Sequence, residues 1–186
     1  MSQMTKKTLG GALKNRMETE PFDKITVKDI VEDCGVNRQT FYYHFQDIYD
    51  LLGWIYKTEA VESISHLKTY KNWQKGFLKI FEYVRENRAF CLNTYHSVGR
   101  EHLELFLYDV VFKMLMDVLD EVALNSSIKK DCKSFIADFY TLAFIGILLN
   151  WLRTGLKEKP EQIVRDVSCL LEGELERAIR KFEKLV

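Results

Sequence analysis

A single glycine between two short amphipathic segments constrains this chain more than any other feature. In the first segment, Val27 and Ile30 lie three residues apart and begin an apolar stripe along one face of a helix. Gly35 follows where that helix must end, and glycine readily adopts the left-handed conformation that lets a chain reverse. Residues 25–45 are therefore predicted to form a helix, a tight turn and a second helix.

The second helix of this pair is predicted to have an apolar inner face and a polar, aromatic outer face. Phe41 and Phe45 are four residues apart and should both face inward, while Asn37 is a suitable N-cap. In a helix-turn-helix protein such a helix enters the DNA major groove N-terminus first, where Arg suits guanine and Gln suits adenine. Hydroxyl and imidazole donors suit phosphate oxygens. The candidate base-reading residues are Arg38, Gln39 and Thr40, the candidate backbone anchors are Tyr42, Tyr43 and His44, and the two N-caps Thr26 and Asn37 complete the expected DNA-contacting set.

Spacing alone is equally compatible with a generic corner of two packed helices that does not bind DNA. The residues that set this segment apart are Ile25-Thr26-Val27, Ile30, Gly35-Val36 and Thr40-Phe41-Tyr42-Tyr43-His44-Phe45. Together they resemble the signature of the TetR family of bacterial transcriptional regulators, and the resemblance covers the first 50 residues. It implies a DNA-binding transcriptional regulator.

One position departs from that family pattern. Family members often carry a lysine at the start of the next helix, where it contacts a phosphate, whereas this chain has Ile48 at about that place. The alternatives are that this phosphate contact is missing or that Tyr49 or Tyr43 substitutes for the lysine. The net charge is zero, although residues 1–17 carry four basic side chains and no acidic one. Affinity is therefore expected to depend more on base contacts and on a dimer than on bulk charge.

The composition and motifs argue against an enzyme and against a membrane protein. The chain has no uninterrupted run of about 18 apolar residues and no apolar signal-peptide core, so a cytoplasmic location is expected. Its four cysteines are widely spaced and are expected to be buried free thiols. Because it has no glycine-rich phosphate loop, zinc-protease motif or nucleophile elbow, no enzymatic activity, cofactor or metal is expected.

Hydrophobic periodicity along the rest of the chain predicts an all-α protein of about nine helices. Residues 1–46 are expected to form a three-helix, helix-turn-helix DNA-binding domain, and residues 47–186 a helical regulatory and dimerisation domain. The expected helices outside the motif span residues 5–20, 47–69, 72–87, 89–95, 101–124 and 129–157, and a final helix runs from Pro160 to about Phe182.

The expected helix over residues 129–157 is apolar over more than one face, so more than one neighbour must cover it, and apolar residues recur at helical spacing in the final helix. A homodimer interface of four helices, two from each copy, would cover them. Packing of both faces inside one chain is the alternative. A two-fold dimer places its reading helices about 34–36 Å apart and so requires a near-palindromic operator. The candidate interface residues are Phe144, Leu148, Trp151, Leu152, Val167, Leu170, Leu171 and Leu175.

The resemblance to the TetR family also implies that a small-molecule or protein effector bound to the C-terminal domain changes DNA affinity. The candidate pocket residues are Trp54, Tyr83, Tyr95, Tyr108 and Tyr140, for which core packing is the common alternative role. The run at residues 146–160 resembles a Firmicutes subgroup of the family that includes an activator of dihydroxyacetone-kinase genes. That resemblance implies control by a protein partner. A repressor is the primary expectation, a protein-controlled activator the alternative, and a helical adaptor that does not bind DNA a more distant one.

Overall fold

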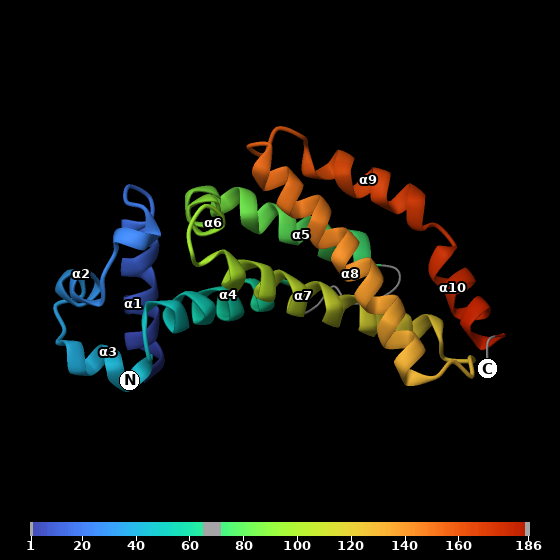
Figure 1. The fold of residues 1–186 in the computed structure, drawn as a ribbon, viewed down its shortest axis with the longest axis horizontal. Coiled ribbons are helices and arrows are strands. Elements are labelled where there is room, and N and C mark those ends of the chain that lie inside the picture. Colours follow the sequence, from blue (N-terminus) through green and yellow to red (C-terminus); the bar gives the residue numbers. More distant parts are fainter. Residues whose placement is uncertain (1, 65–71, 185–186) are drawn as a thin grey trace. The chain divides into compact units, whose positions relative to one another are not determined.

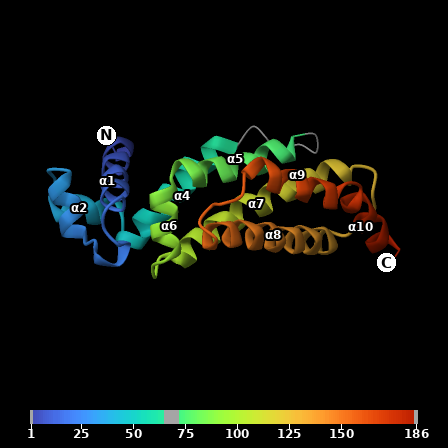
Figure 2. The same cartoon turned by 90° about the horizontal axis from the view of Figure 1, so that it is seen from above.

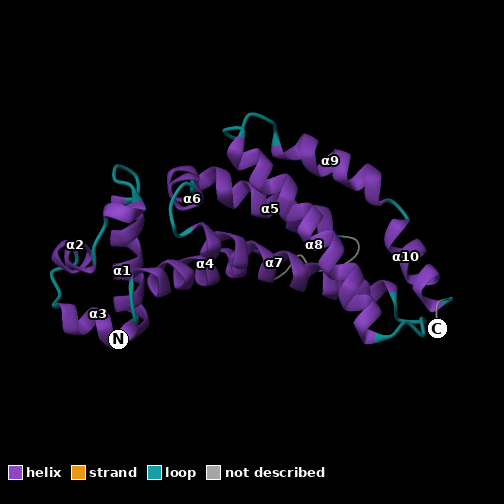
Figure 3. Cartoon of the chain, viewed as in Figure 1, coloured by secondary structure: helices purple, strands orange, loops and turns teal. Residues whose placement is uncertain are grey.

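The computed structural model describes residues 2–64 and 72–184, and their regular structure is entirely helical (Figure 3). This confirms the all-α prediction. The described elements, labelled in Figure 1, are α1 Ser2–Arg16, the 3-10 turn η1 Phe22–Lys24, α2 Val27–Asp33, α3 Arg38–His44, α4 Ile48–Ile64, α5 Trp73–Glu86, α6 Arg88–Tyr95, α7 Arg100–Val122, α8 Lys130–Arg153, α9 Pro160–Leu171 and α10 Glu174–Glu183.

The described residues contain one more helix than the sequence predicted, because the final helix is broken. Gly173 has a φ of 72°, a left-handed conformation that ends α9 and lets α10 start in a new direction (Figure 1). A second left-handed glycine, Gly155 with a φ of 79°, follows the end of α8. Residues 65–69 of the predicted fourth helix lie outside the described residues.

The chain divides into two compact units. The first comprises residues 1–61 and 87–106, and the second comprises residues 62–86 and 107–186. The first unit thus combines the three N-terminal helices with most of α4, with α6 and with the start of α7. The functional boundary expected between residues 46 and 47 stays a prediction, since the first unit is defined by packing and not by function.

The first unit has an apolar core at the centre of its N-terminal helices. α2 and α3 each contact α1 and each other, and Figure 1 shows them grouped beside it. Leu9 and Leu13 of α1, Ile30 of α2 and Phe41 of α3 are each 0% exposed. Burial of these side chains therefore holds α3 against α1 and α2.

The core of the second unit is largely aromatic and lies between α5 and α8. The ring centroids of Phe77 and Phe144 are 4.3 Å apart, and those of Phe81 and Trp151 are 5.0 Å apart. The indole N–H of Trp151 donates to the Glu158 carbonyl at 2.9 Å, which satisfies its polar group. α9 packs along α5 on a further side, as Figure 2 shows. One face of α8 is thus used inside the unit.

Candidate nucleic-acid interface

α2 begins with the N-cap that the sequence predicted. Thr26 Oγ1 accepts a hydrogen bond from the Asp29 N–H at 3.4 Å, while the hydroxyl and N–H of Thr26 donate to Asp29 Oδ2 at 2.6 and 2.9 Å. This is a reciprocal capping box in which Asp takes the place of the usual Glu or Gln. Hydrogen bonds from the side chain and backbone of Thr26 lower the pKa of Asp29.

The turn between α2 and α3 also forms as predicted. Gly35 has a φ of 63°, and the Val36 N–H donates to the Val31 carbonyl at 3.0 Å, which closes the end of α2. Asn37 Oδ1 then caps α3 by accepting from the Thr40 N–H at 2.8 Å and its hydroxyl at 3.0 Å. The side chains of Asn37 and Thr40 are therefore partly committed to shaping α3.

The two faces of α3 differ as the sequence predicted. Phe41 is 0% exposed and Phe45, at the C-cap, is 3% exposed, with their ring centroids 5.8 Å apart. Tyr42 is 58% exposed and Tyr43 is 82% exposed. Among the predicted DNA-contacting residues, the exposed ones are Thr26, Asn37, Arg38, Gln39, Tyr42 and Tyr43, whereas Thr40 and His44 are half-buried. Their contact with DNA stays a prediction, but the structure brings six of the eight together on one helix.

A basic side chain from α1 lies at the C-terminal end of α3. The ammonium of Lys6 stands 5.2 Å from the centroid of the Phe45 ring. Ile48, half-buried, starts α4 nearby in the chain and offers no donor. Of its two expected substitutes, Tyr49 is half-buried between Phe22 and His102, whereas Tyr43 remains exposed. Lys6 is a further candidate for this phosphate contact, and the sequence pattern alone did not single it out.

An ion pair attaches α2 to α1. Arg16 Nε and Nη2 donate to the two carboxylate oxygens of Asp33 at 2.5 and 2.8 Å, a bidentate geometry. The hydrogen bonds with Arg16 lower the pKa of Asp33, and the same pairing raises the pKa of Arg16. Both groups are solvent-accessible, so the pair contributes orientation more than stability.

Most of the residues predicted to form a dimer interface lie inside the second unit. Six of the eight are at most 6% exposed, and the side chains concerned are Phe144, Leu148, Trp151, Leu152, Val167 and Leu175. Their own chain already covers these six side chains, as the intramolecular alternative describes. Their part in a dimer interface stays a prediction. Leu171 is half-buried, and Leu170 is 76% exposed.

The opposite face of α8 carries an apolar stripe that the sequence-based assignment missed. Phe135, Phe139 and Leu142 are 60%, 61% and 62% exposed and follow one another at spacings of four and three residues. We call these three side chains the α8 stripe. Ala143 and Gly146 on the same helix are also exposed. The spacing was visible in the sequence, but the helix has two apolar stripes, and periodicity does not say which one faces the core.

The five aromatic residues predicted to line an effector pocket fall in two different units. Trp54 packs on Phe45 in the first unit, with ring centroids 5.7 Å apart, and Tyr95 lies beneath the Arg100 guanidinium at 4.6 Å. Tyr83 is buried in the second unit.

The other two predicted pocket residues also lie in the second unit. Tyr108 donates to Asp138, and this hydrogen bond raises the pKa of Tyr108 to about 12. Tyr140 lines a cavity of about 230 Å³ together with Phe139 and Phe182. Effector binding by any of the five stays a prediction.

The cysteines are free thiols, but only one is buried. Cys91 is 0% exposed, and burial raises its pKa to about 12. Cys34 and Cys132 are half-buried, and Cys169 is exposed. The expectation of four buried thiols is therefore wrong for three of them. These three cysteines lie close to the ends of α2, α8 and α9, where apolar periodicity does not predict burial.

Comparison with known families accounts for both parts of the chain. Residues 14–53 match the family model described as "Bacterial regulatory proteins, tetR family". Residues 71–173, more than half of the chain, match the model described as "Transcriptional regulator C-terminal region", a TetR C-terminal domain. The chain belongs to the TetR family. It is accordingly a transcriptional regulator, and the capped α2–turn–α3 segment lies inside the N-terminal match.

Two relatives in the TetR family resemble this member over nearly their whole lengths. The HTH-type dhaKLM operon transcriptional activator DhaS of Lactococcus lactis subsp. lactis (strain IL1403) is 29% identical over 172 residues, which is 88% of each chain. A solved structure of the dihydroxyacetone kinase operon activator DhaS has a TM-score of 0.70 at 26% identity. That likeness covers 96% of this chain and 97% of the other.

Proposed function

We propose that this TetR-family regulator binds DNA sequence-selectively through α3. The observation that carries the proposal is the division of α3 into a buried Phe41 face and an exposed face that carries Arg38 and Gln39. Within the described part of the chain Arg38 forms no ion pair, so its guanidinium is available for a guanine edge. Tyr43, which is 82% exposed, supplies a hydroxyl for a phosphate oxygen.

The proposed DNA-binding form is a homodimer joined through the α8 stripe. Three large apolar side chains, each about 60% exposed on one helix face, are costly to leave in water, and a second copy of the same face covers them. In a two-fold dimer the same patch serves both copies. Two reading helices then face DNA about one helical turn apart, which fits a near-palindromic operator.

The test of this proposal is selection of bound duplexes from random DNA by the full chain, followed by binding assays with the Arg38→Ala variant. Loss of a bidentate base contact costs about 1–3 kcal/mol, so Arg38→Ala should relax the preference at one position of each half-site. Arg180→Ala, an exposed arginine of α10, is the matched control and should keep the preference. Selection of no consensus by the wild type, or an unchanged preference in Arg38→Ala, would refute base reading by α3.

A second candidate function is activation under the control of a protein partner. One relative is described as an activator of the dhaKLM operon and the other as a dihydroxyacetone kinase operon activator, and each likeness covers 88% or more of this chain. Repression remains the alternative sign of regulation. A reporter gene placed beside the selected operator distinguishes them: transcription that rises when the chain is expressed indicates an activator, and transcription that falls indicates a repressor.

We place the regulator in the cytoplasm, where its DNA lies. One described helix, α8, is long and apolar enough by length and composition to cross a membrane. Its apolar character has another explanation, because 44% of that stretch is buried in the chain and Phe144 packs on Phe77 of α5. Fractionation of cells that express the tagged chain tests this placement, and recovery with the membrane pellet would contradict it.

A further inference from the structure

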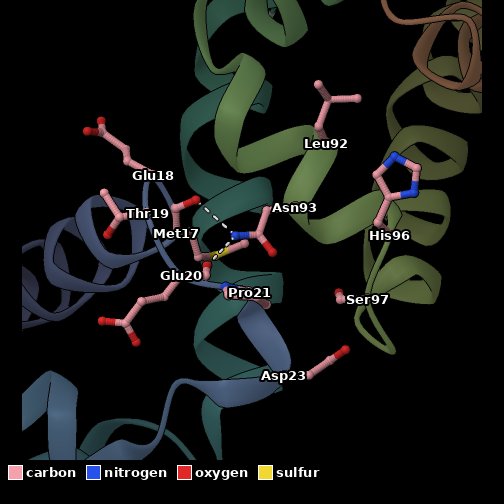
Figure 4. Close-up of a pocket in the computed structure, with 10 residues that line it drawn as sticks. All are labelled: Met17, Glu18, Thr19, Glu20, Pro21, Asp23, Leu92, Asn93, His96 and Ser97. Carbon is pink, nitrogen blue, oxygen red and sulfur yellow. Dashed lines mark hydrogen bonds between the residues drawn. The ribbon is translucent and has the colours of Figure 1, made fainter.

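Asn93 of α6 holds the segment that connects α1 to α2, as the close-up in Figure 4 shows. Its Nδ2 donates to the Met17 carbonyl at 2.9 Å and to the Glu20 carbonyl at 2.6 Å. Its Oδ1 accepts from the Phe22 N–H at 2.8 Å. One half-buried side chain thus joins α6 to a segment more than 70 positions away in the sequence, inside the same compact unit.

The three hydrogen bonds use both the NH2 group and the carbonyl oxygen of the Asn93 side chain. The carbonyls of Met17 and Glu20 lie just past the end of α1, where backbone groups lack helical partners. The Asn93 amide has two N–H donors and a carbonyl acceptor, and it satisfies two carbonyls and one N–H at once. An aspartate would direct a carboxylate at both carbonyls, and an alanine would leave all three backbone groups without this partner.

Phe22, which is hydrogen-bonded to Asn93, also contacts the start of α4. Its ring is 1% exposed and meets the edge of the Tyr49 ring, with centroids 5.4 Å apart. Tyr49 is the second residue of α4, which follows directly after α3 in the chain. The Phe22 backbone is therefore held by α6 while its side chain packs against the helix that follows the DNA-reading one.

The loop after α6 adds a second close contact to the same segment. The Val98 N–H donates to Asp23 Oδ1 at 3.2 Å. A Cβ at Gly99 would lie 3.2 Å from Phe22 Cε1 and 2.9 Å from Leu52 Cδ2, so the loop is packed tightly there. These contacts leave little room for the N-terminal helices to tilt relative to α6.

We propose that Asn93 is a positioning residue that fixes the tilt of the DNA-reading helices on α6 and thereby sets the half-site spacing that the regulator accepts. This inference rests on the proposed function, because spacing has meaning only for a dimer that reads two half-sites. Adding one base pair moves a half-site by about 3.4 Å and rotates it by about 35°. If the two DNA-reading helices of the dimer are held firmly, the altered spacing should lower the affinity. If they are held loosely, they can adjust to the new spacing.

The experiment compares full-length wild type and Asn93→Ala on duplexes that contain the same selected half-sites. One duplex has the preferred spacing, two others add one or two base pairs, and a fourth contains a single half-site. Wild type should lose about tenfold in affinity when the spacing changes, the size of a mismatched contact. The same change in spacing should lower the affinity of Asn93→Ala by less than about threefold, and this variant should keep the wild-type base preference on the single half-site.

Asn15→Ala provides the matched control, since Asn15 lies exposed on α1 in the same unit. It should discriminate spacing as wild type does. Gly99→Ala is a second variant, which disturbs the same junction through Phe22 and Leu52 and keeps the proposal testable if Asn93→Ala does not fold. Gly99→Ala should also reduce the difference in affinity between duplexes of different half-site spacing. Circular dichroism establishes which variants are folded.

The possible failures are distinguishable. A folded Asn93→Ala that retains wild-type spacing discrimination, or a folded Gly99→Ala that does so when Asn93→Ala is unfolded, overturns this inference alone. Equal loss of binding to every duplex, the single half-site included, also overturns it, because the reader itself would then be damaged. A wild type that selects no DNA sequence overturns the proposed function and this inference with it.

Discussion

α3 and α8 both place aromatic side chains on two faces, but they divide them differently. In α3 the phenylalanine Phe41 is buried, and the exposed aromatic residues Tyr42 and Tyr43 each carry a hydroxyl. In α8 Phe144 is buried at 2% exposure, yet Phe139 on the other face is 61% exposed and has no polar group. The first helix thus exposes aromatic rings that can donate hydrogen bonds, and the second exposes rings that cannot.

This difference indicates what each surface binds. A tyrosine presents an apolar ring and a polar tip, so it suits a hydrated, charged partner such as a DNA backbone. A phenylalanine gains only by leaving water, so it suits an apolar partner such as a second copy of α8. Substitutions on the two helices should therefore separate folding, association and DNA binding.

The largest effect is expected from Phe41→Ala, on the buried face of α3. Removing a fully buried phenylalanine ring leaves a cavity and should lower the free energy of unfolding by about 3–5 kcal/mol, measured by urea denaturation. Tyr43→Ala on the exposed face of the same helix is the control and should change that free energy by less than about 0.5 kcal/mol. Equal costs would show that the two faces of α3 are not distinct.

The next effect is expected from Phe139→Asp, in the middle of the α8 stripe. A carboxylate buried against its symmetry mate should weaken association by about 2–4 kcal/mol without unfolding the chain. Sedimentation at micromolar concentration should then give the monomer mass of 22.0 kDa, whereas Phe139→Leu should retain the dimer. Persistence of a dimer in Phe139→Asp would place the interface on another surface.

The sequence predicted α2, the turn and α3 well, because their geometry depends on neighbours in the chain. Thr26 and Asn37 each cap a helix through a residue three positions away, and Gly35 acts on its own backbone. The inward face of α8 was not predictable in this way, because both of its stripes are apolar. The contacts of Asn93 were also unpredictable, since they join segments more than 70 residues apart and leave no local pattern.

A smaller effect is expected from Tyr43→Phe, which keeps the ring on α3 but removes the hydroxyl. Loss of one hydrogen bond to a phosphate should cost about 1.5 kcal/mol, or about tenfold in DNA affinity. Because tyrosine carries no charge, the dependence of affinity on salt should stay the same. Binding assays at two or more salt concentrations measure both quantities. An unchanged affinity would show that Tyr43 contacts no phosphate, and a changed salt slope would show that the substitution altered other contacts.

The smallest effect is expected at the capping box of α2, which belongs to the helix-turn-helix segment and not to α8. The pKa of Asp29 is lowered by its hydrogen bonds with Thr26, so its ionised form stabilises the folded state. That contribution is present above the ordinary pKa of about 3.9 and is lost as the pH falls through the lower folded-state value. Asp29→Asn should therefore be less stable than wild type in urea at pH 7, and the difference should shrink towards pH 3. Asp131→Asn, an exposed aspartate in the first turn of α8, should not reproduce that loss, since the N-cap of α8 makes no side-chain capping hydrogen bond. A difference between wild type and Asp29→Asn that stays constant with pH would show that the capping box does not depend on the charge of Asp29.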